Sequence, residues 1–207
     1  TGRDRKAIID HIEELRSKGI KIELPEKIPI FFRVSPYLLT TENVIEVPCK
    51  ETSGEVEYVI LTAESGKIYI TVGSDHTDRE LEKISVHKSK WVCPKVLSEK
   101  MWDYQDLKDH WDEIELRSFI FENDKKELYQ SAKLETLLKP EEILKEAGHF
   151  EEEGWVIYSG TIPSLRGVVY AENFEINLYD PILNRKIAHR YAIKVLNAGT
   201  FPSQLKV

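Results

Sequence analysis

Three acidic side chains flank two neighbouring apolar segments in the first half of the chain. Glu55 and Glu57 stand at the start of the run that ends at Leu61, and Asp75 follows the next run, Ile68–Val72. Side chains of a strand alternate between its faces, so both glutamates point the same way. Bare like charges at the end of a buried strand are costly, and Mg²⁺, Mn²⁺ or Ca²⁺ offsets that cost because hard cations prefer carboxylate oxygen. The spacing suggests a metal site, with a solvated strand end as the ordinary alternative.

A histidine and a glutamate near the start of the chain form a second candidate pair. Apolar residues recur at helical spacing from Asp4 to Lys18, and Gly19 follows, so this segment is predicted to be a helix. His11 and Glu14 lie three residues apart and can meet on one face of it. From the pattern alone, an ordinary polar flank of an amphipathic helix is favoured.

The elements that must position the three carboxylates form a predicted β-hairpin. The two apolar runs are joined by a short polar turn that contains Gly66. From Val56 to Leu61 both faces of the first strand are apolar or aromatic, which is typical of a strand buried on both sides. The hairpin would bring Asp75 towards the two glutamates from a neighbouring segment.

Short strands with few helices are predicted for the rest of the chain. The expected strands are 30–34, 44–47, 114–120, 127–130, 154–161, 174–178 and 187–196, with helix-prone segments at 103–112 and 140–147. Strict alternation of strand and helix is missing, which argues against a doubly wound parallel sheet.

An ordered set of motifs now resembles a known superfamily. Glu55-x-Glu57, then Asp75-x-x-x-Arg79-x-Leu81, then Lys88-Ser89 before Cys93-Pro94 is similar to the fumarylacetoacetate hydrolase superfamily. The sequence around these motifs resembles an uncharacterised prokaryotic branch of this superfamily. The resemblance implies an α+β, mainly β fold, a mixed β-roll with peripheral helices. It also implies one catalytic domain over residues 1–207, in which 1–50 form a pocket wall or lid.

The resemblance also assigns roles to individual residues. It implies that Glu55, Glu57 and Asp75 hold Mg²⁺ or Mn²⁺, with Ca²⁺ possible in crystals. It implies a catalytic lysine at Lys88, with Lys90 as the competing candidate because the spacing to Cys93-Pro94 differs from the family pattern.

Further roles rest on shorter matches to the same superfamily. Gly2-Arg3-Asp4 followed by His11 and Glu14 resembles its water-activating His–Glu pair, with a longer spacer. Substrate contacts are implied for Arg79, Gln130 and Thr161. Thr161 follows Gly160 as in the family's Gly-Thr-Pro, but Ile162 is inserted before the proline.

The implied reaction is hydrolysis of a C–C bond in an acylpyruvate-like 2-oxo acid or β-diketo acid through a metal-stabilised enolate. Decarboxylation, hydration, dehydration or isomerisation of related 2-oxo acids would use the same site. A non-catalytic homologue that binds metal or ligand is the alternative from another class. Members of the superfamily are commonly homodimers, so a homodimer is expected.

Composition limits the possible partners and compartments. The 207 residues carry a net charge of −7, and basic residues do not cluster with aromatic ones, which argues against a nucleic-acid partner. The chain has no apolar run approaching the ~20 residues that span a bilayer, so no membrane partner is expected. Cys49 and Cys93 lack metal-type spacing, and a reducing, cytoplasmic location fits two isolated cysteines.

Overall fold

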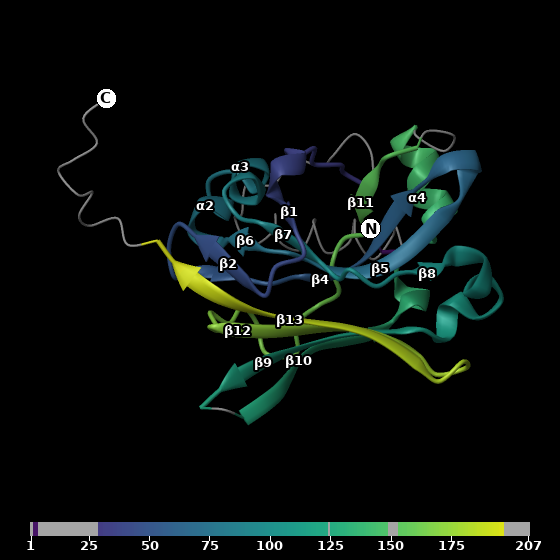
Figure 1. The fold of residues 1–207 in the computed structure, drawn as a ribbon. Coiled ribbons are helices and arrows are strands. Elements are labelled where there is room, and N and C mark those ends of the chain that lie inside the picture. Colours follow the sequence, from purple (N-terminus) through teal and green to yellow (C-terminus); the bar gives the residue numbers. More distant parts are fainter. Residues whose placement is uncertain (1, 4–28, 124, 149–152, 197–207) are drawn as a thin grey trace, which may run out of the picture.

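A computed structural model describes residues 2–3, 29–123, 125–148 and 153–196 of the chain (Figure 1). The predicted helix over 4–18, with His11 and Glu14, lies outside the described residues. Within them the chain is mainly β, with curled sheets and a few short helices, which confirms the expected α+β, mainly β class. The described residues contain no helix with the length and apolarity that crossing a membrane would require.

The first sheet contains the predicted hairpin. Its strands, in spatial order, are β1 (Leu39–Thr40), β7 (Lys95–Leu97), β5 (Ile68–Asp75), β4 (Val56–Thr62) and β11 (Val156–Tyr158), with β8 (Trp102–Asp103) also paired to β5. The β1–β7 pair is parallel and the other pairs are antiparallel. Strand β4 is buried along almost its whole length, as its apolar composition predicts.

The second sheet is built mostly from the C-terminal half. Its strands, in spatial order, are β10 (Lys125–Lys133), β9 (Glu115–Glu122), β12 (Asn173–Asp180), β13 (Arg185–Val195) and β2 (Val44–Val47). Only the β13–β2 pair of this sheet is parallel. Figure 1 shows this sheet running along one side of β4 and β5, with the helices α2 (Arg79–Glu82), α3 (Val86–Trp91) and α4 (Pro140–Ala147) on the other side.

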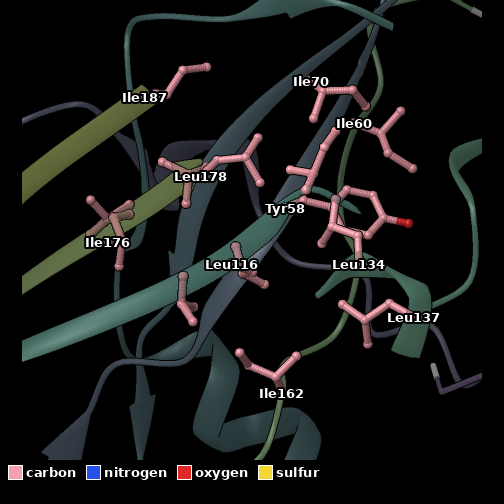
Figure 2. Packing of buried hydrophobic residues seen from close by; sticks show 14 of the residues in the cluster. Tyr58, Ile60, Ile70, Leu116, Leu134, Leu137, Ile162, Ile176, Leu178 and Ile187 are labelled. Atoms are coloured by element: carbon pink, nitrogen blue, oxygen red, sulfur yellow. The ribbon is translucent and has the colours of Figure 1, made fainter. Parts of the chain in front are cut away.

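Apolar side chains from the two sheets meet in one core (Figure 2). Tyr58 and Ile70 come from the first sheet, and Leu116, Ile176 and Leu178 come from the second. Each of these side chains is almost fully buried, and burying one such group contributes roughly 1.5–3 kcal/mol. The β4–β5 hairpin, which carries the acidic residues, is therefore packed between the second sheet and the helices.

Short elements complete the frame around the end of the hairpin. Strands β3 (Thr52–Ser53) and β6 (Thr77–Asp78) pair just beyond the ends of β4 and β5. The 3-10 turns are Pro36–Leu38, Glu64–Gly66, Tyr104–Asp106, Lys108–Glu113 and Leu134–Thr136. Helix α4 begins at Pro140 and ends before Gly148, which takes a left-handed φ of 75°, as predicted from the sequence.

One local prediction was wrong, and another was correct only in part. Residues 30–34 form no strand, because the Arg33 carbonyl accepts hydrogen bonds from the side chains of His87 and Trp91 instead of a neighbouring strand. The helix-prone segment forms two short 3-10 helices, Tyr104–Asp106 and Lys108–Glu113, rather than one longer helix. Within the second, His110 adopts a non-helical φ of −131° next to the buried Trp111.

Candidate metal centre

Strand register places the three carboxylates on one face of the hairpin. Glu57 pairs directly with Gly73 across the β4–β5 ladder, and Asp75 stands two residues beyond Gly73. Directly paired residues share a face, as do residues two apart along a strand. The backbone N–H of Asp75 also donates to the Glu55 carbonyl at 3.0 Å. As a result, one carboxylate oxygen from each of Glu55, Glu57 and Asp75 lies within 4.8 Å of the others.

This donor set fits a hard divalent cation. Oxygens on opposite sides of an ion with bonds of about 2.1–2.4 Å stand roughly 4.2–4.8 Å apart. Glu57 and Asp75 are buried and Glu55 is nearly so, which makes three unshared negative charges expensive here. Asp75 Oδ1 is buried, and its partner among the described residues is the ammonium group of Lys95. These carboxylates could hold Mg²⁺ or Mn²⁺.

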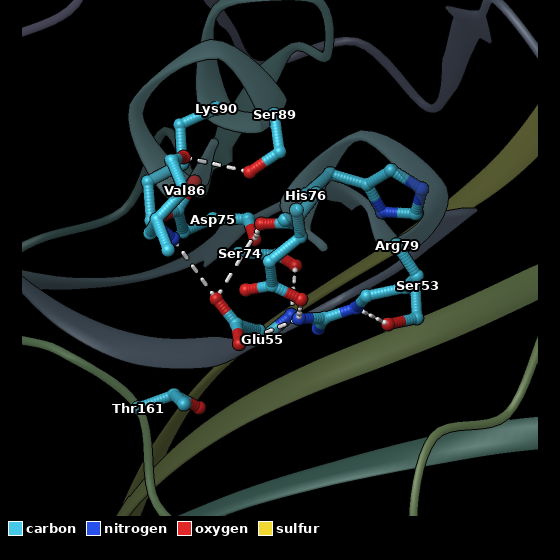
Figure 3. A network of polar contacts seen from close by, with 12 residues as sticks. Ser53, Glu55, Ser74, Asp75, His76, Arg79, Val86, Ser89, Lys90 and Thr161 are labelled. Carbon is cyan, nitrogen blue, oxygen red and sulfur yellow. Dashed lines mark hydrogen bonds and ion pairs between the residues drawn. The ribbon is translucent and has the colours of Figure 1, made fainter. Parts of the chain in front are cut away.

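Two lysines meet the carboxylates from different elements. Lys90, on α3, lies 3.2 Å from Glu55 Oε2 and also contacts Asp75 Oδ2 (Figure 3). Lys95, which pairs with Asp75 across β5 and β7, places its Nζ 2.7 Å from Asp75 Oδ1. Lys95 also donates to the His76 carbonyl at 2.7 Å, and its side chain is 2% exposed. Asp75 is thus held between two ammonium groups.

Arg79 holds the remaining glutamate in position. Its Nη1 lies 3.1 Å from Glu55 Oε1 and 2.8 Å from Glu82 Oε2, while Nε donates to Ser53 Oγ. Figure 3 shows the guanidinium lying between Ser53 and Glu55. Arg79 was predicted to contact the substrate; in the structure its contacts are with Glu55, Glu82 and Ser53, and the substrate contact stays a prediction.

The pKa values of the charged groups diverge within this cluster. Burial, together with the neighbouring Asp75, raises the pKa of Glu57 well above its usual range. Burial alone would raise the pKa of Asp75 as well, but Lys90 and Lys95 outweigh it and hold that pKa low. Although burial opposes it, the three carboxylates together raise the pKa of Lys90 above its usual value. Such opposed shifts within one small volume are typical of functional sites.

Backbone from the segment after β11 supports Glu57. The Gly160 N–H donates to Glu57 Oε2 at 2.6 Å, and Gly160 has a positive φ of 86°, a conformation that glycine adopts without strain. The Thr161 hydroxyl donates to the Val56 carbonyl and accepts from Gln130 Nε2, each at 2.9 Å. The loop is thereby fastened to the start of β4.

Gln130 and Thr161 were predicted to bind the substrate; the structure gives both of them partners within the protein, and the substrate role stays a prediction. The buried Gln130 amide accepts from Val56 N and Ser118 Oγ and donates to Thr161 and the Ile162 carbonyl. All of its hydrogen-bonding groups are used inside the protein. The Thr161 hydroxyl donates to the Val56 carbonyl and accepts from Gln130, which leaves it one further acceptor lone pair.

The lysine at the carboxylates is Lys90 rather than Lys88. Residues 88 and 90 lie on α3, where a separation of two residues turns the side chain by about 200° around the helix axis. Lys90 therefore faces the site, while Lys88 is exposed on the opposite side. Sequence spacing left both candidates open because it did not establish that this segment is helical.

Lys95 and Gly73 are site residues that sequence reasoning missed. A lysine directly after Cys93-Pro94, in the otherwise apolar Lys95–Leu97, was a signal for a buried cation that needs an acidic partner. A Cβ at Gly73 would come within 2.6 Å of Tyr158 Cε1 and 2.7 Å of the Val96 carbonyl. The glycine lets Tyr158 pack over the strand next to the carboxylates.

A network of buried, uncharged side chains is hydrogen-bonded behind the carboxylates. His76 is fully buried between Thr52 Oγ1 at 2.9 Å and the Tyr191 hydroxyl at 3.2 Å. Tyr191 reaches Ser74 Oγ, which accepts from the Glu55 N–H. Burial, reinforced by nearby Lys95, lowers the pKa of His76 to about 3, so the ring is neutral at physiological pH. This network fixes the backbone that carries Glu55 and Asp75.

An open surface depression lies beside α3. It has a volume of about 590 Å³ and is lined by residues 33–38 together with His87 and Trp91. The side chains of His87 and Trp91 both reach the Arg33 carbonyl, so the segment and the helix are tied together. Helix α3 therefore connects the carboxylate cluster to the segment before β1.

Comparisons with known proteins place this geometry in context. The family described as "Protein of unknown function (DUF2848)" matches residues 1–191. Among curated proteins, none matches the sequence.

Solved structures share the fold. A structure of "2-keto-3-deoxy-D-arabinonate dehydratase complexed with magnesium and 2,5-dioxopentanoate" superimposes with a TM-score of 0.61 at 16% identity, covering 80% of this chain and 62% of that one. The structure titled "Crystal structures of Cg1458" gives a TM-score of 0.52 at 15% identity, covering 75% of this chain and 66% of that one. The chain spans less than two thirds of the length of either protein, and identities this low establish a common fold alone.

Proposed function

We propose that this chain, which belongs to the family described as "Protein of unknown function (DUF2848)", is a divalent-metal-dependent enzyme acting on a small 2-oxo acid or β-diketo acid. The observation that carries the proposal is the convergence of Glu55, Glu57 and Asp75 within 4.8 Å in a buried setting. The shared fold with a dehydratase whose title names magnesium and a dioxo acid supports it. We extend the proposal to membership of the fumarylacetoacetate hydrolase superfamily and to its mixed β-roll.

The roles of the chain's own residues follow from the geometry. Glu55, Glu57 and Asp75 would hold Mg²⁺ or Mn²⁺, which when bound supplies Lewis-acid polarisation of the substrate's 2-oxo group. Arg79 and the Gly160 N–H keep two of these carboxylates in position. Lys90, already beside the carboxylates, would place positive charge near the substrate oxygen that gains negative charge.

C–C hydrolysis of an acylpyruvate-like substrate is the reaction we propose first. It needs a base that takes a proton from water as the hydroxide adds to the distal carbonyl. The carbon–carbon bond then breaks, its electron pair moves towards the 2-oxo group, and the base returns its proton to the carbon that has lost the acyl group. His11, oriented by Glu14, is proposed for this step, and both residues lie outside the described part of the chain.

Dehydration of a 2-keto-3-deoxy sugar acid is the second candidate. The specific observation that favours it is the fold shared with structures titled 2-keto-3-deoxy-D-arabinonate dehydratase, including an apo form at a TM-score of 0.60. Both reactions begin from a 2-oxo acid and build negative charge next to the oxo group. A single domain, a homodimer and a cytoplasmic location remain predictions that accompany either one.

Turnover assays separate these possibilities. An acylpyruvate, oxaloacetate and a 2-keto-3-deoxypentonate would each be offered to the protein with Mg²⁺ or Mn²⁺. The wild type is expected to consume one of them, Glu57→Gln to lose that activity, and Lys88→Met to keep it. If the protein binds metal but turns over none of the three classes, the enzyme proposal is contradicted and a non-catalytic binding homologue remains.

A further inference from the structure

The carboxylate cluster already contains its own positive charges. Two of the three carboxylates, Glu55 and Asp75, form ion pairs with Lys90 or Lys95, and Arg79 is shared between Glu55 and Glu82. If Arg79 and Glu82 are counted as a neutral pair, three negative charges meet two positive ones. The cluster therefore stands close to neutrality without any metal.

The position of each lysine makes it a direct competitor of a cation. Lys90 Nζ contacts Glu55 Oε2 and Asp75 Oδ2, which belong to two of the three proposed ligands. Lys95 Nζ lies 2.7 Å from the other oxygen of Asp75, and its side chain is 2% exposed, so water screens it poorly. A dication added beside two buried ammonium groups leaves the cluster with net positive charge.

We propose that Lys90 and Lys95 act as built-in counter-ions, so that a divalent cation binds weakly alone and tightly only together with an anionic chelating ligand. The anion supplies the negative charge that the lysines have already neutralised on the protein. By linkage, the cation strengthens anion binding by the same factor. This inference rests on the proposed metal-dependent function and adds that substrate and metal occupy the site as a pair.

The two lysines are expected to affect metal binding to different extents. Lys95 donates to the His76 carbonyl as well as contacting Asp75, and it is a buried residue of strand β7, so its charge stays in place. Lys90 has carboxylates as its hydrogen-bond partners among the described residues and is 13% exposed, which allows its ammonium to move aside. Because Lys90 contacts two of the three proposed ligands and Lys95 contacts one, removing Lys90 should have the larger effect on metal binding.

Mn²⁺ titration followed by electron paramagnetic resonance tests the proposal. The proteins are the wild type, Lys90→Met, Lys95→Met and, as the matched control on the same helix, Lys88→Met. Each is titrated alone, with the dianion oxalate, and with the neutral analogue oxamide, after correction for the Mn²⁺–oxalate complex in protein-free solution. Circular dichroism and thermal melting check that each variant folds.

The expected result is a charge-dependent pattern. Without a ligand, Lys90→Met and Lys95→Met should bind Mn²⁺ at least about tenfold more tightly than the wild type, because each removes a cation within a few ångströms. Lys88→Met should match the wild type. Oxalate should tighten Mn²⁺ binding to the wild type by at least about tenfold, and less in Lys90→Met, whereas oxamide should not. Should Lys95→Met fail to fold, Lys90→Met alone decides the outcome.

Two failures are distinguishable. If the wild type binds Mn²⁺ alone as tightly as Lys90→Met does, and oxalate adds nothing, the counter-ion proposal is overturned while the metal-dependent function stands. If neither the wild type nor Lys90→Met binds Mn²⁺ with or without oxalate, both the proposal and the metal-dependent function fail.

Discussion

Two buried aspartates, each at the end of a β-hairpin strand, are used in opposite ways. Asp75 ends β5, and Asp180 ends β12. The Asp180 side chain is fully buried, and its Oδ1 accepts from the backbone N–H groups of Ile182 and Leu183. Its Oδ2 accepts from Arg185 and lies 3.0 Å from His110 Nε2. Every part of that carboxylate has a fixed partner.

Asp75 differs because its neighbours include two other carboxylates and its partners are lysine ammonium groups. Backbone donors and a guanidinium hold a carboxylate rigidly, which stabilises a turn. Like charges beside exchangeable ammonium groups are costly to assemble and are typical of sites that receive a ligand. Burial alone does not identify a functional acid, whereas the identity of its partners does.

The largest expected effect is the loss of turnover when a carboxylate of the Asp75 cluster is changed. Glu57→Gln keeps the shape of the side chain and its acceptor for the Gly160 N–H but removes one negative charge from the cluster. Because metal assistance supplies several kcal/mol, turnover of the active 2-oxo acid should fall by about 10³-fold. Steady-state kinetics at saturating Mg²⁺ measure it. The thermal stability of the metal-free protein should not fall, since the pKa of Glu57 is already raised by burial.

A complementary loss of stability is expected at the other aspartate. Asp180→Ala removes the acceptor of two backbone N–H groups and the partner of Arg185, and breaking a buried pair costs roughly 3–5 kcal/mol. Urea unfolding measures this change, and the Mn²⁺ affinity of the folded protein should stay at the wild-type value. A loss of Mn²⁺ affinity equal to that of Glu57→Gln would remove the distinction between the two regions.

A smaller effect is expected from packing beside the metal ligands. In Gly73→Ala the new methyl group would overlap the Tyr158 ring and the Val96 carbonyl, and overpacking of this kind costs about 1–3 kcal/mol. Thermal melting measures the loss. Gly148→Ala offers a control with open space around its Cβ but a left-handed φ of 75°. Equal Mn²⁺ affinity in Gly73→Ala and the wild type would mean that this close approach does not position the carboxylates.

The smallest expected effect is a pH dependence that belongs to Asp180. Burial opposes ionisation, but His110, the Leu183 N–H and Arg185 outweigh it and lower the pKa of Asp180 below its usual value. A lowered folded-state pKa stabilises the protein above the unfolded value of about 3.9, and that stabilisation is lost as the pH falls below it. The difference in unfolding free energy between the wild type and Asp180→Asn should therefore shrink between about pH 5 and pH 3. A difference independent of pH would contradict this assignment.

The central hairpin was predictable from the sequence because period-two alternation and a glycine turn determine it locally. The same alternation put Glu55 and Glu57 on one face, and the structure brings Asp75 to them through the β4–β5 register. Helix α4 was also predictable, since Pro140 and Gly148 mark its ends.

Side-chain partners were less predictable because they depend on pairing between distant segments. The choice between Lys88 and Lys90 needed the helical conformation of α3, and Lys95 needed the pairing of β7 with β5. Gln130 was predicted to contact the substrate, and the sequence did not show that its amide NH₂ group donates to Thr161 and Ile162 of the loop after β11. The strand expected over 30–34 was lost to side chains of α3.

Anomalous diffraction from a crystal soaked with Mn²⁺ and oxalate tests the central claim most directly. The account predicts one strong manganese peak per chain, about 2.0–2.6 Å from an oxygen of each of Glu55, Glu57 and Asp75. A manganese peak elsewhere, or no peak while Lys90 still contacts Glu55 and Asp75, would contradict it.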